Sequence, residues 1–531
     1  MFEQAIIDQI GKHKFSDKDK VLHAYRQNAS QLVVEIKGIL FPDSAQDVKI
    51  IIQLANQYHK SLYPIGTGKN WGLGSRLPVG NGAYIVDLKR MNRIIEVNET
   101  HGYAVIEPGV TQDQLYQYLK ARQLPFILNV TGSAASTSII GNALDRGIGH
   151  FGPRVEDISN LEVVTGNGQV IHTGMGRFHN SKTTSLYPYG IGPDITGLFF
   201  QSNFGIVLKA SVQLLFQTEL SGVIRLTLKD YANLVPFMDQ LIALRRAGVF
   251  HATIHLSNPS RSQSVLSPLL FDQFLQKYND LEKAKQKTRI YMKQHVPPLW
   301  SANLTVRGSS AAVKQAYHQV KKQLAHLATV QVETVQSRQR ALRRTRIFSF
   351  LPGMKERSLF LKATNGVFGH SQGIPSDDSL KSVEWEGKME KSSFSVELDK
   401  LDVGTLFVLP TLPLSGNAVK DVMKQTHDIM KEKYGFIPYM TFNMINERSI
   451  EAVINLVFDK QDDQKSRLAH QCIEEMQATF IEKGYIPYRT GIQLMDQVYP
   501  KQTPYDGFYQ QLKQMFDPND CIAPGRYGYK Q

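Results

Sequence analysis

The sequence predicts an α+β protein in which a domain of small strands is interrupted by a second domain of antiparallel sheet covered by helices. Residues 1–217 are rich in glycine and in short apolar runs such as AYIVDL and LEVVTG, separated by amphipathic stretches, a pattern typical of alternating strands and helices. From residue 218, charged helical stretches alternate with strands such as VIRLTLK, TLFVLP and EAVINLVFD. A sheet covered by helices on one face fits this second texture.

The chain of 531 residues is too long for a single core. We expect one domain over residues 1–217 and a second over 218–486. Residues 487–531 regain the turn-rich texture of the first domain and are expected to return to it. Residues 353–399 carry little periodicity and are predicted to form a long loop over a site.

Composition excludes several protein classes. Hydrophobic residues make up 42% and charged residues 21%, which are globular values. No apolar run reaches the roughly 18 to 20 residues needed to span a bilayer, and the start MFEQAIIDQIGKHKF lacks the features of a signal peptide. We therefore expect a cytoplasmic protein without a membrane span. Two cysteines, Cys472 and Cys521, are too few for a disulfide framework or a cysteine metal cluster.

The formal net charge of +13 raises the question of a nucleic-acid partner. Basic residues are spread along the chain except in SRQRALRRTR, residues 337–346, and no nucleic-acid-binding signature is present. We interpret that cluster as a solvated helix face and expect no nucleic acid. An anionic cofactor and an acidic redox partner explain a basic surface equally well, and the sequence does not separate them.

The most informative stretch is SLYPIGTGKNWGLGS, where four glycines, Gly66, Gly68, Gly72 and Gly74, follow a strand-like run. Closely spaced glycines let backbone N–H groups approach a diphosphate. The dinucleotide fingerprint G-x-G-x-x-G fails, because its third glycine falls on Trp71. A Walker loop fails as well, because Lys69 is followed by Asn70.

Five further motifs follow the glycine loop: VIEPGVT (105–111), SIIGNALDRGIGHFG (138–152), GLFFQSNFGIVLKA (197–210), PYRTGIQLMD (487–496) and IAPGRYG (522–528). This ordered set, over essentially the whole chain, resembles the vanillyl-alcohol oxidase and 4-cresol dehydrogenase family of FAD-dependent oxidoreductases. The resemblance implies a two-part FAD-binding domain with an inserted cap domain, and an enzyme that is an FAD oxidase or dehydrogenase.

The resemblance also implies which residues hold FAD. The glycine loop would wrap the pyrophosphate, the next two motifs would lie along the flavin, and the strand after residue 204 would meet the adenine end. The cofactor residues implied are Pro64, Ile65, Gly66, Thr67, Gly68, Lys69, Asn70, Trp71, Gly72, Pro108, Gly109, Val110, Ser138, Gly141, Asn142, Arg146, Gly149, Gly205, Ile206, Val207, Arg489 and Arg526.

Catalytic roles are implied for a neighbouring pair. Oxidation by a flavin leaves negative charge on the reduced ring, which a fixed guanidinium stabilises. Arg489 matches the family arginine with that role, and Tyr488 matches a tyrosine that binds a phenolic oxygen of the substrate. The implied substrate is a small molecule, phenolic or aromatic in character.

Three departures put a phenolic substrate in question. Leu73 stands where the family has a second phenol-binding tyrosine. Ser133 stands where vanillyl-alcohol oxidase has an acidic residue near flavin N5, and is closer to the serine of the cresol enzyme. His150 replaces a family tyrosine beside the Gly-x-Gly run. A different substrate class, such as a 2-hydroxy acid, an amine or a biosynthetic intermediate, therefore stays open. A flavin-binding protein without turnover is a further alternative, which the retained Tyr488 and Arg489 argue against.

A fourth departure concerns flavin attachment. Thr405 stands where the oxidase has its linking histidine, and SFSVELD (393–399) offers no tyrosine where the cresol enzyme has one. We therefore expect non-covalent FAD. Thr405 and Phe407 are expected to line the substrate side, together with Leu73, His255 and Tyr488.

Histidines supply the remaining acid–base candidates. His150 lies in a flavin-proximal motif and titrates near neutral pH when unperturbed, and His255 is expected to point from a cap strand into the pocket. No metal-ligand spacing is present, so no metal is expected. Oxygen, a cytochrome and a quinone stay open as electron acceptors, and a homodimer stays open as the assembly.

Overall fold

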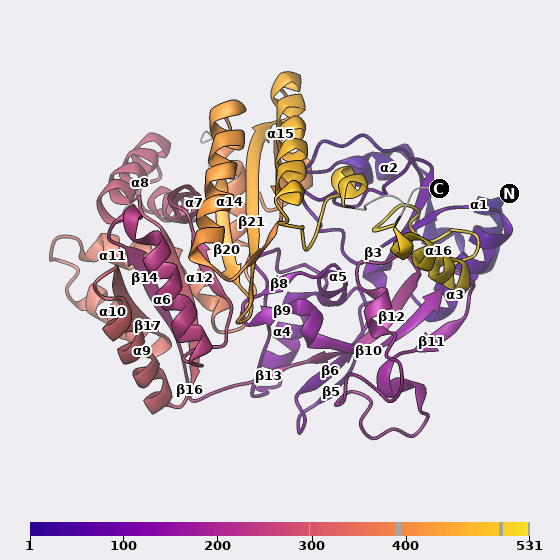
Figure 1. Ribbon diagram of the computed structural model, residues 1–531, viewed down its shortest axis with the longest axis horizontal. Helices are drawn as coiled ribbons and strands as arrows, with labels where there is room; N and C mark the ends of the chain where they lie inside the picture. Colours follow the sequence, from indigo (N-terminus) through magenta and orange to yellow (C-terminus); the bar gives the residue numbers. More distant parts are fainter. Residues whose placement is uncertain (297, 388–394, 499–502, 529–531) are drawn as a thin grey trace.

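Two sheets near the N-terminus and one larger sheet in the middle of the chain organise the computed structural model (Figure 1). The structure describes residues 1–296, 298–387, 395–498 and 503–528. The large sheet and its helices lie to one side in Figure 1, and the two other sheets lie to the other side with both termini.

The first sheet has the order β1-β2-β4-β3, and β4 pairs in parallel with both β2 and β3. The parallel pairs need a crossover, which α3 provides between β2 and β3. Every residue of β4 is buried, because this strand is central and covered on both faces. The elements are α1 (Phe2–Ile10), β1 (Phe15–Ser16), α2 (Asp19–Arg26), β2 (Ile36–Leu40), α3 (Ala45–Gln57), β3 (Leu62–Ile65) and β4 (Ala83–Asp87).

The second sheet is antiparallel with the order β11-β10-β12-β6-β5. Two short helices precede β10 and run over the region between the sheets. The elements are β5 (Ile94–Asn98), β6 (Tyr103–Ile106), α4 (Gln112–Ala121), α5 (Ile139–Leu144), β10 (Ile158–Thr165), β11 (Val170–His172) and β12 (Gly205–Gln213).

The third sheet is the cap sheet, with the order β17-β14-β16-β15-β20-β21-β18 and with β19 paired to β21. Its pairings are antiparallel. Its strands are β14 (Leu220–Leu228), β15 (Ile254–Ser257), β16 (Ser301–Gly308), β17 (Ala328–Thr334), β18 (Val403–Val408), β19 (Thr411–Pro413), β20 (Tyr439–Met444) and β21 (Ser449–Asp459).

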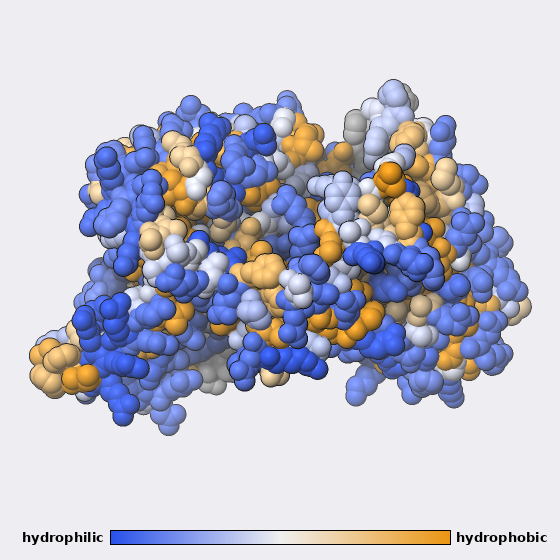
Figure 2. Space-filling model, turned by 90° about the horizontal axis from the view of Figure 1, so that it is seen from below, coloured by the Kyte–Doolittle hydropathy of each residue, from blue (hydrophilic) through white to orange (hydrophobic). Residues whose placement is uncertain are grey.

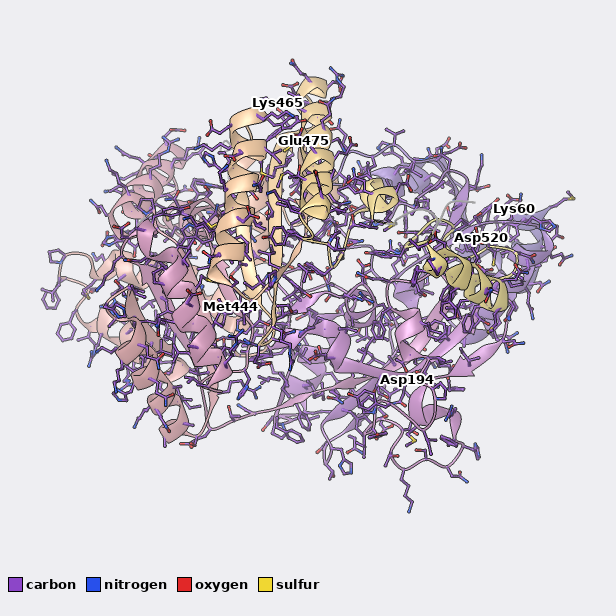
Figure 3. The ribbon with its side chains drawn as sticks, in the orientation of Figure 1. Lys60, Asp194, Met444, Lys465, Glu475 and Asp520 are labelled. Carbon is purple, nitrogen blue, oxygen red and sulfur yellow. The ribbon has the colours of Figure 1, made fainter. Side chains whose placement is uncertain are left out.

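One face of the cap sheet is apolar and carries helices. Ile254, Leu256, Phe442 and Met444 are fully buried and belong to one hydrophobic cluster with side chains of the covering helices. These helices are α6 (Leu234–Arg246), α9 (Ser310–Leu324), α14 (Gly416–Thr426) and α15 (Asp463–Glu482). In Figure 3, Lys465 and Glu475 project from α15 on the outer side of the cap. Because alternate strand residues face opposite ways, the other face carries a different set of side chains.

The predicted loop over residues 353–399 is wrong for its greater part, because the segment is mainly helical. It contains α11 (Met354–Ala363), α12 (Asn365–His370) and α13 (Lys381–Gly387). Leu361, Ala363 and Trp385 are buried, and the last two pack in one cluster with α7 (Pro259–Tyr278) and α8 (Leu281–His295). The sequence hides this helical character because each helix is short and interrupted by Ser, Gly and Asp.

The chain ends against its own N-terminal part. Leu62 in β3 forms a parallel bridge with Ile522, and Phe516 at the end of α16 (Pro504–Phe516) stacks on Phe204 with ring centroids 5.5 Å apart. Figure 1 shows α16 beside α3, far from the cap. The cap strands lie between residues 220 and 459, so the α+β class with an inserted cap is confirmed. The boundaries at 217 and 487 remain a proposal.

The basic cluster of residues 337–346 lies on α10 (Val335–Ile347), where Arg340, Arg343 and Arg344 are exposed. The turn that follows exposes apolar side chains at one end of the molecule (Figure 2), namely Ile347, Phe348, Phe350 and Leu351. Within the described residues, no helix is both long and apolar enough to cross a bilayer.

Candidate active site

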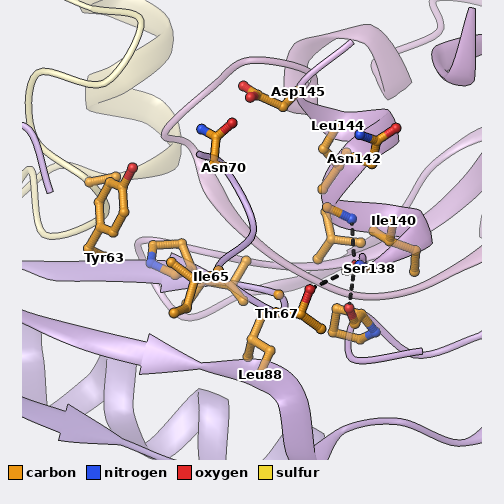
Figure 4. Close-up of a pocket in the computed structure, with 18 of the residues that line it drawn as sticks. Tyr63, Ile65, Thr67, Asn70, Leu88, Ser138, Ile140, Asn142, Leu144 and Asp145 are labelled. Atoms are coloured by element: carbon orange, nitrogen blue, oxygen red, sulfur yellow. Dashed lines mark hydrogen bonds between the residues drawn. The ribbon is translucent and has the colours of Figure 1, made fainter. Parts of the chain in front are cut away.

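A cavity opens at the carboxyl end of β3, where the glycine loop begins (Figure 4). The loop needs glycine for two reasons. Gly68 and Gly72 have φ angles of 67° and 74°, which side chains rarely tolerate. At Gly66 a Cβ atom would lie 2.9 Å from the side chain of Ser138. The loop therefore brings its backbone close to the next motif, with little space for side chains between them.

Ser138 ties three segments of the cavity wall together. Its N–H donates to Thr67 Oγ1 at 3.0 Å, and its hydroxyl donates to Pro108 O at 2.6 Å. The same hydroxyl accepts the N–H of Gly141 at 2.9 Å and caps α5. Three motifs that are distant in sequence are thereby fixed on one cavity, as the dashed lines of Figure 4 show.

A buried charge network closes the cavity. The Asp145 carboxylate pairs with Arg489 at 2.6 Å and with Arg526 at 2.9 Å. Arg526 also donates to the Tyr63 hydroxyl at 2.6 Å, and Arg489 donates to Asn70 Oδ1. Both arginines line the cavity, so two guanidinium groups face it with one carboxylate to fix them.

Some polar atoms of the cavity wall have no partner. Thr137 Oγ1, Asn142 Oδ1 and Arg489 Nε are buried without a hydrogen bond, although all three residues line the cavity. An unpaired buried polar atom costs about 1–3 kcal/mol. Such atoms indicate a polar ligand that supplies the missing partners.

The second face of the cap sheet is polar and faces this region. A row of aligned residues crosses four strands: Asn303, His255, Asn443 and Glu451. Asn443 is only 3% exposed and donates to Glu451 O at 3.0 Å, while its Oδ1 meets His255 Nδ1 at 2.7 Å. A polar row on a buried sheet face forms one wall of a site rather than part of a core.

Three contacts hold the cap against the glycine loop. Lys69 Nζ pairs with Glu397 at 3.1 Å, and Ser75 donates to Asp399 Oδ1 at 2.6 Å. A Cβ atom at Gly72 would lie 2.3 Å from the ring of Phe407, so the β18 strand passes directly over the loop. The cap and the glycine loop are therefore in direct contact.

Tyr488 and Glu451 place two acid–base groups close to each other where the cap meets the FAD-binding part. Burial, followed by the charge of Glu451, raises the pKa of the Tyr488 hydroxyl, so that this hydroxyl stays protonated at neutral pH. Burial also raises the pKa of Glu451 to about 7, against the opposing influence of Arg146 and Arg489. Glu451 Oε2 is buried without a partner. A carboxyl group poised near neutrality in a site can take up or release a proton.

His150 and His255 lie close together where the two parts meet, with ring centroids 5.3 Å apart and planes tilted by 32°. His150 Nε2 lies 2.5 Å from the hydroxyl of Thr305 on the cap sheet. Burial and the neighbouring imidazoles lower the pKa of His150, and burial lowers that of His255. Both rings are therefore neutral at pH 7 in this structure.

Comparison with known proteins supports the resemblance. Residues 36–174 match the family model described as an FAD binding domain. A 1'-carboxy-chondrochloren decarboxylase from Chondromyces crocatus is 30% identical over 93% of this chain and 91% of its own length. The flavoprotein subunit of 4-cresol dehydrogenase from Pseudomonas putida is 25% identical over 91% of this chain and 86% of its own.

The chain belongs to the vanillyl-alcohol oxidase and 4-cresol dehydrogenase family of FAD-dependent oxidoreductases. A 4-ethylphenol oxidase from Gulosibacter chungangensis, solved as an isoeugenol complex, has the same fold with a TM-score of 0.84 at 22% identity. The match covers all of this chain and 97% of that one. The family identifies the protein as an enzyme that uses FAD.

The residues of the cavity fit an FAD diphosphate and flavin. The glycine loop offers backbone N–H groups in a crevice too narrow for side chains, and two arginines provide positive charge. The orphaned Asn142 Oδ1 and Arg489 Nε suit the donors and acceptors along a flavin ring. When bound, FAD supplies a two-electron acceptor that takes a hydride.

Most residues expected to hold FAD line this one cavity: Pro64, Ile65, Gly66, Thr67, Gly68, Lys69, Asn70, Pro108, Ser138, Gly141, Asn142, Gly205, Ile206, Val207, Arg489 and Arg526. Six others stand outside its lining: Trp71, Gly72, Gly109, Val110, Arg146 and Gly149.

The six have other surroundings. Gly109 and Gly149 allow close packing, because a Cβ atom would lie 2.7 Å from Leu88 O at the first and 2.1 Å from Asn129 Oδ1 at the second. Trp71 and Val110 are buried beside the cavity, and Gly72 lies under Phe407. Arg146 is exposed with a φ of 51° and acts on Glu451 instead.

Some of the residues expected on the substrate side lie where the cap meets the FAD-binding part, and others are occupied by packing or by hydrogen bonds elsewhere. Tyr488, Phe407 and His255 stand between the cap and the loop, on the polar face or against it. Leu73 is 5% exposed. Thr405 is fully buried and its hydroxyl donates to Leu456 O at 3.0 Å, so it is occupied within the sheet. Ser133 Oγ lies 2.5 Å from Thr131 Oγ1.

Sequence reasoning missed Asp145, Glu451 and His370. Asp145 lies in the motif GNALDRG, but its partners Arg489 and Arg526 are more than 300 residues away in sequence, so no local pattern marks the pairing. Glu451 lies in an alternating strand, and only the cross-strand register places it beside Asn443. His370 lies in the segment expected to be a loop.

Proposed function

We propose that the protein oxidises a carbon of a small phenolic or aromatic substrate, with hydride transfer to non-covalently bound FAD. The observation that carries this proposal is that Tyr488 and Arg489 are neighbours in sequence but contact different parts of the protein. Arg489 lines the FAD cavity, while Tyr488 interacts electrostatically with Glu451 on the polar face of the cap sheet.

The backbone holds this pair in place. The N–H of Tyr488 donates to Leu409 O at 3.2 Å, at the end of β18, and its carbonyl accepts from Gln201 Nε2 at 2.8 Å. Pro487 bridges to Pro410 in the cap. Both parts of the protein therefore position the hydroxyl of Tyr488, which supports a role in orienting a substrate oxygen.

The chain's own groups have separable roles in this reaction. Arg489, fixed by Asp145, keeps positive charge where electron density increases during oxidation. Tyr488 donates a hydrogen bond to a substrate oxygen, since burial keeps it protonated. Glu451 accepts a proton from the substrate or its hydroxyl, since its pKa is raised to about 7.

Non-covalent attachment is supported by the side chains near the glycine loop. Thr405 uses its hydroxyl within the sheet, and Phe407 offers no nucleophile. The first two residues of SFSVELD, Ser393 and Phe394, lie outside the described residues.

A second substrate class is supported by one specific observation. The relative from Chondromyces crocatus is named a decarboxylase, so oxidation of a carboxylated biosynthetic intermediate is the second candidate. The departure at Leu73 favours it over a simple alkylphenol, because the family has a second phenol-binding hydroxyl at that position.

The deciding experiment is anaerobic mixing of the holoenzyme with phenols, aromatic acids, alcohols, amines and 2-hydroxy acids, followed by the flavin absorbance. Bleaching by phenolic or aromatic compounds alone supports the proposal, and bleaching by aliphatic hydroxy acids or amines alone contradicts it. Readmitting air, cytochrome c or a quinone to the bleached enzyme then identifies the electron acceptor.

A further inference from the structure

Three imidazoles lie near the polar face of the cap sheet. His150 comes from the FAD-binding part, His255 from β15 and His370 from the end of α12. The rings of His150 and His255 lie with centroids 5.3 Å apart and planes tilted by 32°. His370 acts electrostatically on His150, and His255 acts on His370.

The first two rings are only partly covered by protein. His150 and His255 are half-buried, so part of each ring stays accessible. Burial among protein atoms is nevertheless the main cause of the lowered pKa of each ring.

Hydrogen bonds fix the tautomer of His255. The amide nitrogen of Asn443 donates to Glu451 O at 3.0 Å, so its Oδ1 faces His255 at 2.7 Å. An amide oxygen only accepts, so Nδ1 of His255 carries the proton. Nε2 of the neutral ring therefore bears a lone pair and accepts a hydrogen bond. Taking a proton at Nε2 converts this ring into a charged donor.

The surroundings of the three rings lack a counter-charge. Within the described residues, the charged groups that shift the pKa of His150 and His370 are other imidazoles, and no carboxylate is among them. The pKa of His255 is shifted by burial and by its hydrogen bond with Asn443. Burial lowers the pKa of His370 to about 4. Arg307, whose guanidinium lies 5.0 Å from the Phe151 ring centroid, is a nearby cation with an unpaired Nε. The described residues also contain no His, Cys, Asp or Glu group able to hold a metal ion.

We propose that His150, His255 and His370 form a binding site for a carboxylate group of the substrate. The proposal rests on the proposed function, because it places the anionic end of the molecule whose oxidised carbon lies near Tyr488 and FAD. Each ring has a polar neighbour that orients it: Thr305 for His150, Asn443 for His255 and Ser376 for His370. A carboxylate supplies the charge that lets a ring take up a proton in this buried place.

The cap register sets the scale of the expected substrate. His255 and Glu451 are separated by β20, which means two strand spacings of about 4.8 Å each. For an aromatic head beside Glu451 and Tyr488, we expect an elongated molecule whose carboxylate lies about 10 Å from Glu451.

The test compares carboxylates with their neutral amides on the holoenzyme without oxygen. The probes are 3-(4-hydroxyphenyl)propanoate and its amide, together with 3-phenylpropanoate and its amide, followed by the change in flavin absorbance. At pH 6 we expect each acid to bind about tenfold or more tightly than its amide, the usual effect of a charge-assisted hydrogen bond. Between pH 7 and pH 9 that preference should fall by about tenfold per unit, because one proton must be taken up.

Calorimetry in buffers of different ionisation enthalpy measures that proton directly. Uptake of about one proton with the acids and none with the amides supports the site. His255→Gln should abolish both the preference and the uptake, and His370→Gln should weaken them. His251→Gln changes an exposed histidine nearby and should leave both unchanged.

The outcomes separate the two proposals. Equal binding of acids and amides with no proton uptake overturns the carboxylate site, even if phenols bleach the flavin. Proton-linked binding of 3-phenylpropanoate without bleaching by any phenol keeps the site and contradicts the phenolic substrate. If His255→Gln fails to fold, the pH dependence and proton uptake of the wild-type protein still decide.

Discussion

Asp145 and Arg489 form a 2.6 Å ion pair in the wall of the FAD cavity, and the same carboxylate holds Arg526 at 2.9 Å. One acid therefore orients two guanidinium groups that come from the C-terminal segment. The pair joins the motif GNALDRG to the motif PYRTG across the whole cap insertion. One carboxylate shared by two arginines leaves a net positive charge in the cavity wall.

Replacing Arg489 by alanine should slow flavin reduction by about 10²- to 10³-fold, the usual effect of losing one electrostatic stabiliser. FAD binding should weaken far less, because the glycine loop and Arg526 remain. Anaerobic stopped-flow reduction and FAD titration of the apoprotein measure the two effects. Arg246→Ala, which changes an exposed arginine at the end of α6, is the control. Unchanged reduction rates in Arg489→Ala would remove this residue from the mechanism.

Asp145→Asn should lower the free energy of unfolding by up to about 3 kcal/mol, because it leaves two partly buried arginines, Arg489 and Arg526, without their counter-charge. Urea denaturation of the apoprotein measures the loss. Asp8→Asn removes an exposed carboxylate that accepts from Gln4 and should have little effect. A loss no larger than that of the control would show that water or Tyr63 compensates the arginines.

The sequence predicted the fold and most of the FAD cavity because both depend on local signals. Glycines mark the backbone positions where φ is positive or packing is close, and alternating apolar residues mark the strands. The residues that line the cavity, such as Ser138 and Arg526, lie in those same motifs. The sequence motifs and the cavity-lining residues are therefore largely the same.

The substrate side was predictable only in part, because it depends on strand register. Glu451 meets Asn443, and Asn443 meets His255, only because β20 pairs with β21 and β15 with β20 at those positions. No local signal records such long-range pairing. The helices of residues 354–387 were missed for a related reason, since tertiary packing stabilises them more than their own sequence does.

The flavin should leave the protein on acid precipitation. Thr405 donates its hydroxyl to Leu456 O, and Phe407 packs over Gly72 without a nucleophilic atom. A yellow supernatant over a colourless, washed pellet is the expected result, read from the absorbance of each fraction. Colour that stays in the pellet after washing with denaturant would mean a covalent bond elsewhere.

Glu451→Gln should change how stability depends on pH. Burial raises the pKa of Glu451 to about 7 in the folded protein, above the ordinary value of 4.5, so the folded state holds this proton more tightly than the unfolded state. Its contribution to stability is therefore present below pH 4.5 and is lost as pH rises through 7. Relative to wild type, the variant should gain up to about 3 kcal/mol between pH 5 and pH 8.

Urea denaturation of both proteins at pH 5 and pH 8 measures that difference, since other titrating groups are common to both. Glu156→Gln removes an exposed neighbouring carboxylate and serves as the matched control. Flavin reduction adds a second readout, because loss of a proton acceptor should remove a step near pH 7 from the rate profile. Parallel stability curves for variant and wild type would show that Glu451 is ionised at neutral pH.

Gly72→Ala tests the contact that closes the cap on the glycine loop. A Cβ atom at this position would lie 2.3 Å from the Phe407 ring, and the φ of 74° disfavours any side chain. We expect a purified variant that binds FAD at least tenfold more weakly, because β18 must move off the loop, and the backbone strain alone costs about 1 kcal/mol or more. Gly80→Ala meets no atom within 4 Å and should bind FAD like the wild type. Gly72→Ala combined with Phe407→Ala removes the clash while leaving the strain, so partial recovery of FAD affinity would identify Phe407 as the obstructing group. No recovery would assign the whole effect to the backbone of the loop.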